Sequence, residues 1–226
     1  MALLSVENLT VELQTSRGMA AAVRGVSFAL ERGGTLGIVG ESGCGKSITA
    51  LALLGLLPDG ARARGRVDLD GTDLLTLDED ALCHIRGNRI AMIFQEPMTS
   101  LNPVHRIGRQ IAEPLRLHRG MRGAAAREEV LRLLDRVGLP DPARRIDAYP
   151  HQLSGGQRQR VMIAMALSCA PDILLADEPT TALDVTIQGQ ILDLISELVE
   201  DNGMGLILIS HDLGVIGETV DNVAVM

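Results

Sequence analysis

Aromatic residues are almost absent from this sequence, which has no tryptophan, one tyrosine and two phenylalanines among its 226 residues. An excess of basic residues is absent too, because 21 Lys and Arg stand against 29 Asp and Glu, for a formal net charge of −8. Proteins that bind nucleic acid contact the phosphates with cationic side chains, and those that bind single strands stack the bases on aromatic rings. The composition therefore argues against nucleic acid as a partner.

Long apolar segments are also missing. No stretch approaches the roughly 18–20 apolar residues that span a bilayer. The start of the chain, Met1 to Leu13, alternates apolar and polar residues like a β-strand and lacks the basic end and apolar centre of a signal peptide. The three cysteines have no paired spacing, which fits a reducing compartment. At this length we expect a single α/β domain with a substantial core.

A glycine-rich segment near the start fits the phosphate-binding pattern G-x-x-x-x-G-K-[ST] at every fixed position. Its residues, hereafter the phosphate-binding loop, are Gly40, Glu41, Ser42, Gly43, Cys44, Gly45, Lys46 and Ser47. An apolar strand is predicted before the loop over 35–39 and a buried helix after it over 48–57. Backbone N–H groups and a helix N-terminus then face the phosphates, Lys46 reaches the β- and γ-phosphates, and the Ser47 hydroxyl ligates Mg²⁺. The alternative is a structural turn with an exposed lysine.

Two further apolar segments end in residues that suit phosphate chemistry. Asp177 and Glu178 follow a predicted buried strand over 173–176, at the end of a strand where α/β proteins bind ligands. Asp177 is predicted to hold Mg²⁺, directly or through water, and Glu178 to act as the general base on the attacking water. A helix cap is the alternative for this pair. His211 follows a third strand over 206–210 and is predicted to meet the γ-phosphate, whereas the other four histidines receive a structural interpretation.

A second anion site is predicted at Leu153-Ser154-Gly155-Gly156-Gln157, hereafter the signature motif. Ser154 and the glycines precede a predicted helix over 157–169. A serine hydroxyl, unpaired N–H groups and a helix N-terminus together bind anions. A chain with two such sites can place one on each side of a triphosphate.

Taken together, these motifs resemble those of the ABC-family nucleotide-binding domain over nearly the whole chain and in the family's order. The phosphate-binding loop resembles the Walker A motif, and 173–178 the Walker B motif. Ala182-Leu183-Asp184 resembles the D-loop. Gln95 resembles the Q-loop glutamine, and His211 resembles the switch histidine.

The resemblance implies an α/β fold: a P-loop NTPase (RecA-like) core with an N-terminal antiparallel β subdomain and an inserted helical subdomain. The single domain, 1–226, would comprise the core and β subdomain over 1–94 and 161–226 and the helical subdomain over 95–160. It also implies head-to-tail pairing, in which Ser154, Gly155, Gly156, Gln157 and Asp184 contact ATP held by the partner's loop. Gln95 would touch Mg²⁺ and the water, and the reaction would be hydrolysis of ATP to ADP and phosphate.

Three stretches resemble the peptide and nickel importer branch, which includes glutathione importers: 93–103, 149–152 and 184–188. A generic polar turn is the alternative for 97–103. The helix after the phosphate-binding loop favours the first of the branch's two ATPase types. The implied partners are a second, non-identical ABC ATPase subunit, two transmembrane permease subunits docked by the residues after Gln95, and indirectly a substrate-binding protein. The chain would be a peripheral motor subunit on the cytoplasmic face of the inner membrane.

Two alternatives remain open at this stage: a soluble ABC ATPase of translation, DNA repair or cofactor assembly, and the first half of a tandem ABC ATPase. The second arises because family members continue beyond Val225-Met226, where we expect a truncated chain. A further departure from the family is the lack of an adenine-stacking aromatic near Arg17, whose guanidinium could stack instead.

Two smaller features complete the predictions. Cys44 lies at a helix N-terminus beside Lys46, where thiol pKa values fall, and we expect it to be alkylated faster than Cys83 or Cys169 and to be protected by Mg-ATP. Arg144-Arg145 reads as a solvated face, with a partner contact as the alternative.

Overall fold

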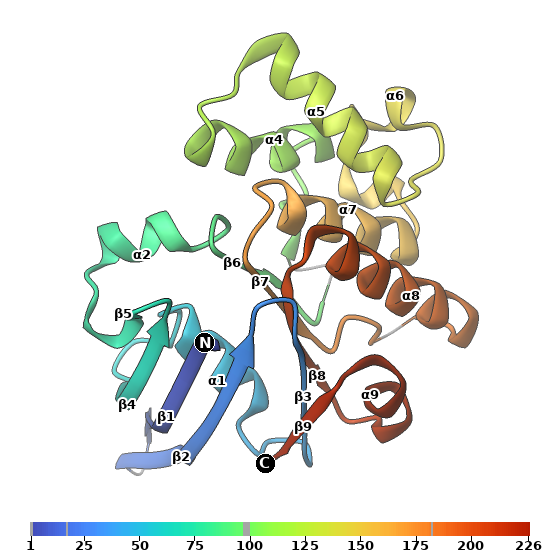
Figure 1. Ribbon diagram of the computed structural model, residues 1–226. Helices are drawn as coiled ribbons and strands as arrows, with labels where there is room; N and C mark the ends of the chain where they lie inside the picture. Colours follow the sequence, from blue (N-terminus) through green and yellow to red (C-terminus); the bar gives the residue numbers. More distant parts are fainter. Residues whose placement is uncertain (1, 17, 97–99, 182) are drawn as a thin grey trace. The chain divides into compact units, whose positions relative to one another are not determined.

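The computed structural model describes residues 2–16, 18–96, 100–181 and 183–226 (Figure 1). It divides into two compact units, the first formed by Met1–Arg86 with Gly203–Met226 and the second by Gly87–Asn202. Both units contain helices and parallel strands. Among the described residues, no helix is both long and apolar enough to cross a membrane.

The first unit contains an antiparallel sheet of order β2-β1-β4-β5. Its strands are β1 (Ala2–Thr15), β2 (Gly18–Glu31), β4 (Arg62–Leu69) and β5 (Thr72–Asp73). A hairpin turns at Asp70-Gly71: Leu69 pairs with Thr72, and the turn residues have φ of 53° and 88°. Two successive positive φ values define the turn whose twist matches that of paired strands.

A bulge in β1 explains a change of parity in its apolar residues. Leu4 and Val6 are buried at even positions, whereas Leu9 and Val11 are buried at odd ones. The register with β2 shifts between Val6 and Leu9, where Asn8 has a φ of 49°. The additional residue returns the apolar side chains to the same face of the sheet, which a regular strand could not do.

The first unit also contains three parallel strands, with β3 (Thr35–Val39) between β8 (Gly205–Ser210) and β9 (Asn222–Val225). Its helical elements are α1 (Lys46–Leu53), η1 (Leu74–Thr76), α2 (Glu79–Ile85) and α9 (Leu213–Thr219). Helix α9 packs directly on β3, because a Cβ on Gly37 would lie 2.6 Å from Cγ2 of Ile216. The strands predicted over 35–39 and 206–210 are confirmed.

The helix predicted over 48–57 was wrong at its end, since α1 stops at Leu53. Gly55 has a φ of 63° and donates its N–H to Ala52 O, while Leu56 N donates to Leu51 O at 2.9 Å. This pair of hydrogen bonds is a glycine-dependent helix terminator. The apolar run continues past it, which is why composition alone placed the end too late.

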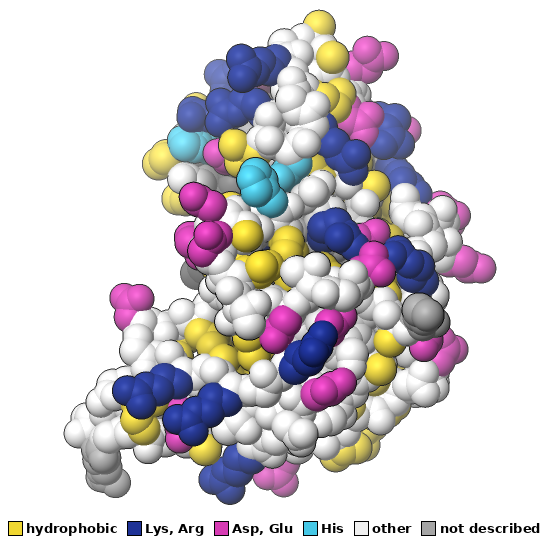
Figure 2. Space-filling view, turned by 60° about the vertical axis from the view of Figure 1, so that its left-hand side comes forward, with side chains coloured by type: hydrophobic (Ala, Val, Ile, Leu, Met, Phe, Trp, Pro, Cys, Tyr) yellow, Lys and Arg dark blue, Asp and Glu magenta, His cyan; other side chains and the backbone are white. Residues whose placement is uncertain are grey.

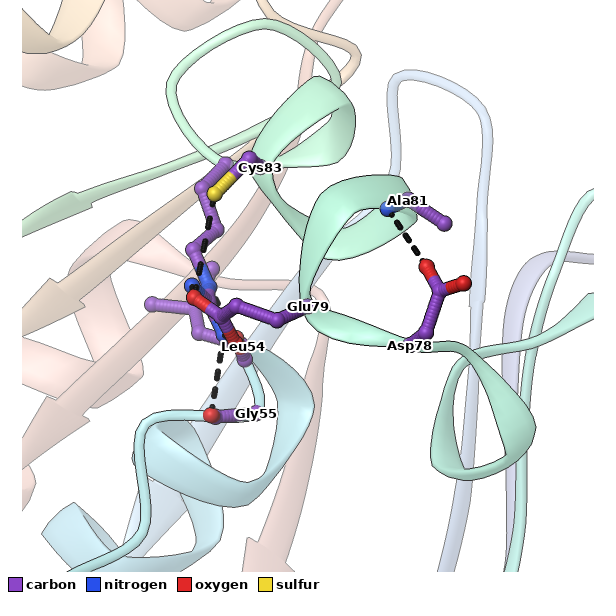
Figure 3. Close-up of polar contacts among 7 residues, drawn as sticks. Leu54, Gly55, Asp78, Glu79, Ala81 and Cys83 are labelled. Atoms are coloured by element: carbon purple, nitrogen blue, oxygen red, sulfur yellow. Dashed lines mark hydrogen bonds and ion pairs between the residues drawn. The ribbon is translucent and has the colours of Figure 1, made fainter.

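Arg86, the residue that follows α2, holds the end of α1 in place. Figure 3 shows Glu79 and Cys83 of α2 close to Leu54 and Gly55, the two residues that follow α1. Arg86 donates from Nε to Leu54 O at 2.7 Å and from Nη2 to Gly55 O at 3.0 Å. Glu79 orients the guanidinium by accepting from Nη2 at 3.1 Å, and this arginine lowers the pKa of Glu79. Cys83 donates its S–H to Glu79 at 3.7 Å. The contacts satisfy carbonyls that the end of a helix leaves without partners, so they fix the helix whose other end carries the phosphate-binding loop.

The second unit contains the parallel pair β6 (Ile90–Ile93) and β7 (Ile173–Asp177). Its helical elements are α4 (Ile107–His118), α5 (Gly123–Arg136), α6 (Pro142–Arg145), η2 (Pro150–Gln152), α7 (Gly155–Leu167) and α8 (Val185–Asn202). Apolar side chains on one face of α5 and of α8 are buried, including Val130, Leu133, Ile191 and Leu198. Helix α7 begins at Gly155, two residues earlier than predicted, because Ser154 caps it.

Candidate active site

The phosphate-binding loop joins β3 to α1 in a conformation that only glycine accommodates at two positions. Gly43 and Gly45 have φ of 82° and 104°, in the left-handed region. A Cβ on Gly45 would lie 2.4 Å from Ala22 O, so the loop rests directly on the backbone of β2. A Cβ on Gly40 would lie 2.7 Å from Sγ of Cys44, which leaves no room for a side chain there either.

Lys46 is the first residue of α1 and lies beneath this loop. Its side chain is buried, with 6% exposure, and Nζ donates to Gly40 O at 2.8 Å and to Glu41 O at 3.0 Å. No acidic residue occurs in the first turn of α1. A buried ammonium at a helix N-terminus concentrates positive charge where an anion would approach. Ser47 follows and is half-buried, with its hydroxyl in the same turn.

His211 lies at the same edge of the first unit as the loop. It follows β8, whose last residue, Ser210, pairs with Val39 at the end of β3. Because these strands are parallel, their carboxyl ends coincide, and both the loop and the histidine emerge there. His211 is exposed, and the next residue, Asp212, caps α9 by accepting from the N–H of Gly214 at 2.8 Å.

The second unit brings Gln95 and Glu178 together in the same way. They follow β6 and β7, which pair in parallel with Ile93 opposite Ala176. Gln95 Nε2 donates to Glu178 Oε2 at 3.1 Å, and Thr181 Oγ1 donates to the same oxygen at 3.0 Å. Two donors on one oxygen orient the carboxylate, as a general base requires.

The backbone at Glu178 is in an uncommon conformation. Its φ is 45°, in the left-handed region that disfavours side chains with a Cβ. Asp177, the residue before it, is buried in β7 with 4% exposure. Backbone strain of this kind often accompanies functional residues. Thr181 was not predicted as a site residue, because its role depends on a turn in which its N–H donates to Glu178 O at 3.1 Å.

The signature motif forms a capping box at the start of α7. Ser154 Oγ accepts from Gln157 N at 3.3 Å, and Gln157 Oε1 accepts from Ser154 N at 3.1 Å. Gly155 and Gly156 lie in the first helical turn, rather than before it as predicted. Their N–H groups are therefore among those that a helix N-terminus leaves without intrahelical partners.

One groove of about 550 Å³ in the second unit combines the signature motif with the D-loop. Leu183, Asp184 and Ile187 line it together with the residues from Ser154 to Gln157. Asp184 begins α8 by accepting from Ile187 N at 3.0 Å. The predicted site residues thus fall into two groups, with the phosphate-binding loop and His211 in the first unit and the others in the second. Arg17, Pro97, Met98, Thr99 and Ala182, which belonged to the predicted features, lie outside the described residues.

The three cysteines differ in access, which bears on the predicted reactivity of Cys44. Cys44 is half-buried, Cys83 is exposed and Cys169 is buried. Cys44 Sγ lies 3.9 Å from the Lys46 ammonium, within the phosphate-binding loop. Because Cys83 is more exposed than Cys44, faster alkylation of Cys44 than of Cys83 would be a demanding test of the prediction.

We predict that Mg-ATP slows alkylation of Cys44 and leaves Cys83 unchanged, because bound phosphates would cover the loop. Mass spectrometry after timed labelling, with and without Mg-ATP, measures both rates. Equal rates at the three cysteines, or an unchanged rate at Cys44 when nucleotide is added, would contradict the prediction.

Comparison with known proteins adds to this geometry. The family described as ABC transporter matches residues 23–181. The dipeptide transport ATP-binding protein DppD of Bacillus subtilis (strain 168) is 54% identical over 225 residues, which cover 99% of this chain and 67% of that protein. The glutathione import ATP-binding protein GsiA of Shigella dysenteriae serotype 1 (strain Sd197) is 54% identical over 233 residues, covering 99% of this chain and 37% of that one.

Solved structures give the same result for the fold. The dimeric structure of MJ0796, a bacterial ABC transporter cassette, superimposes with a TM-score of 0.85 at 30% identity and covers 99% of this chain and 94% of that chain. A dimeric post-hydrolysis state of the same cassette, bound to ADP and Pi, gives a TM-score of 0.83 at 33% identity over 94% and 89% of the two chains. The predicted P-loop NTPase fold is confirmed.

Proposed function

This chain belongs to the ABC transporter family as an ATP-binding domain, and we propose that its ATP hydrolysis drives the import of peptides or a related small solute. ATP-binding proteins of this family are ATPases coupled to transport. The observation that carries the substrate class is the 54–56% identity, over 99% of this chain, to dipeptide and peptide import ATP-binding proteins.

The residues divide the hydrolytic work among themselves. Lys46 and the N–H groups of the phosphate-binding loop hold the β- and γ-phosphates in place. Glu178 accepts a proton from the attacking water, and Gln95 and Thr181 keep its carboxylate oriented. His211 lies at the same edge of the first unit as the phosphate-binding loop, and it donates a hydrogen bond to a γ-phosphate oxygen. Positioning and charge stabilisation are the main protein contributions to phosphoryl transfer.

The donor set fits Mg²⁺, which is a hard cation that prefers oxygen ligands and retains several waters. Ser47, Gln95 and Asp177 offer a hydroxyl, an amide and a buried carboxylate oxygen. Among the described residues, no three His, Cys, Asp or Glu side chains cluster as a metal site. When bound, Mg²⁺ supplies neutralisation of the charge on the β- and γ-phosphates.

A second ABC ATPase, non-identical to this chain, completes the site in our proposal. The signature motif would contact ATP on the partner's loop, with Ser154 and Gly156 as the main donors and Asp184 at the same groove. The motif's exposed first-turn N–H groups support this role, and so do the dimeric structures among the similar cassettes. Each pair of chains would thus share two sites.

The membrane partner is assigned to a second groove in the same unit, hereafter the arginine groove. It has a volume of about 290 Å³ and an apolar floor that includes Ala126, Val130 and Ile146. Figure 2 shows several basic side chains, in dark blue, in the upper part of the view, and the second unit has no lysine, so its basic side chains are all arginines. The arginines that line the groove are Arg106, Arg109, Arg116, Arg122 and Arg127.

The charge of this groove selects its partner. Asp147 is the acidic residue that lines it, and it pairs with both Arg106 at 3.2 Å and Arg127 at 3.3 Å. Hydrogen bonds to Tyr149 and Asp147 raise the pKa of Arg106. The rim is cationic because five arginines, which are protonated at neutral pH, surround one aspartate. An amphipathic segment with acidic residues, presented by a permease subunit, matches an apolar floor with a basic rim. Such docking would hold the chain at the cytoplasmic face of the membrane as a peripheral subunit.

Purification of the tagged chain from the membranes of its native cells tests this function. We expect recovery of two membrane proteins and a second ATPase. The double variant Arg109→Glu/Arg122→Glu should lose the membrane proteins, because its rim repels an acidic segment. The matched control, Arg62→Glu/Arg64→Glu, reverses two exposed charges on β4 and should retain them. Recovery of ribosomes or DNA instead would favour a soluble ABC ATPase and contradict the proposal.

A further inference from the structure

Arg145, at the end of α6, contacts the signature motif from outside it. Its Nη1 donates to Gln157 Oε1 at 3.2 Å. The same oxygen accepts the Ser154 N–H at 3.1 Å in the capping box. One acceptor atom therefore joins α6 to the N-terminus of α7, where the first-turn N–H groups lie.

The backbone that carries Arg145 is fixed to α4. Ile107 N donates to Ala148 O and Gly108 N to Ile146 O, both at 2.9 Å. These are N–H groups that the start of α4 leaves without intrahelical partners. Ile146 is buried, and a Cβ on Gly108 would lie 2.4 Å from its Cγ1. Only glycine at that position allows the close contact, so the segment after α6 moves with α4.

The environment of Arg145 distinguishes it from its neighbour. Its Nε is buried and has no hydrogen-bond partner among the described residues. Arg144, one residue earlier, is exposed. A solvated arginine would avoid a buried N–H group without a partner, because that arrangement costs free energy. The side chain of Arg145 is therefore held in one position by its surroundings. The interpretation of Arg144-Arg145 as a solvated face was wrong for Arg145.

Charge gives the contact a role that depends on nucleotide. A cation beside a helix N-terminus is unfavourable for the helix alone, because it adds to the positive end of the helix dipole. The same cation becomes favourable when a triphosphate approaches that end. The contact thus contributes more to the nucleotide-bound pair than to the free chain.

We propose that Arg145 is a positioning residue for the signature motif. Through Gln157 it fixes the Ser154 hydroxyl and the first-turn N–H groups of α7 for the partner's ATP. Ile146 and Gly108 also line the arginine groove, so a protein bound there touches the segment on which Arg145 is mounted. This inference rests on the proposed function of the signature motif.

The first test mixes the Glu178→Gln protein with the second ATPase recovered with it, a pair that ATP should hold together. Arg145→Ala is expected to raise the ATP concentration for half-maximal pairing by about three- to tenfold, the effect of losing one hydrogen bond of ordinary strength. ATP affinity of the chain's own loop should be unchanged, as measured with a fluorescent nucleotide. Arg144→Ala is the matched control and should change neither value. Arg145→Lys keeps the charge without the planar fork and should fall between them.

The second test needs no partner. Hydrogen–deuterium exchange of the amides from 153 to 160 should be about three- to tenfold faster in Arg145→Ala than in Arg144→Ala. In the Gln157→Ala background, Arg145→Ala should have no further effect on exchange, since the hydrogen bond from Arg145 to Gln157 is already lost.

The two tests separate the two proposals. If Glu178→Gln forms no ATP-held pair with the second ATPase, the proposed function fails, and exchange alone decides on Arg145. Equal behaviour of Arg145→Ala and Arg144→Ala, or additive effects of Arg145→Ala and Gln157→Ala, would overturn the inference. If Arg145→Ala does not fold, the same comparisons with Arg145→Lys decide it.

Discussion

Replacing Glu178 by glutamine is expected to lower the rate of ATP hydrolysis by about 10²–10⁴-fold, the usual contribution of a general base. ATP binding should persist, because the phosphate-binding loop is unchanged. Glutamine has the same shape and keeps a side-chain oxygen that accepts from Gln95 and Thr181. It cannot take a proton from water, so the substitution removes the chemistry and leaves the packing.

Phosphate release measured at saturating ATP gives the rate, and a fluorescent nucleotide gives the affinity. Gel filtration with ATP and the second ATPase should show that the variant accumulates in an ATP-held pair, since the bound nucleotide is no longer consumed. Glu200→Gln, at an exposed position on α8, is the matched control and should hydrolyse ATP normally. Near-normal turnover in Glu178→Gln would remove Glu178 from the role of general base.

Replacing Lys46 by alanine is expected to weaken ATP binding by about 10- to 100-fold, as the loss of a charged hydrogen-bond partner of the phosphates implies. The ammonium lies beneath the loop and donates to Gly40 O and Glu41 O, so it is held where the β- and γ-phosphates are expected. Hydrolysis should fall with binding. Arg62→Ala removes an exposed cation from the same unit and serves as the control.

Lys46 is the only lysine in the sequence, which provides a direct measurement. An amine-reactive reagent can modify only this side chain and the N-terminal amine. ATP should slow modification of Lys46 and leave the N-terminal amine unaffected. An unchanged rate at Lys46, or an unchanged ATP affinity in Lys46→Ala, would contradict the assignment of the loop.

The features that could be predicted from the sequence are those set by short-range pattern. The phosphate-binding loop needs glycines at fixed spacing, and strands such as β3, β7 and β8 are apolar runs bounded by polar residues. Within the first unit, parallel pairing of β3 with β8 places their carboxyl ends together. Gln95 was predicted from the family resemblance alone, and its contact with Glu178 emerged from the pairing of β6 with β7. These predictions required no knowledge of packing.

The features that could not be predicted depend on contacts between distant residues or on single dihedral angles. Gly55 ends α1 within an apolar run, and composition does not show where a glycine takes a positive φ. Thr181 reaches Glu178 only through a turn. Arg145 lies beside α7 because the segment after α6 is bonded to α4, a packing arrangement that no periodicity in the sequence encodes.

The left-handed backbone at Glu178 makes the best residue for stability differ from the residue that the proposed reaction needs. Glycine would adopt this φ without a steric cost, whereas a residue with a Cβ loses about 1 kcal/mol there. Replacing Glu178 by glycine is therefore expected to stabilise the fold while it removes the side chain that we propose as general base, so variants recovered in a screen for thermostability should include inactive proteins altered here.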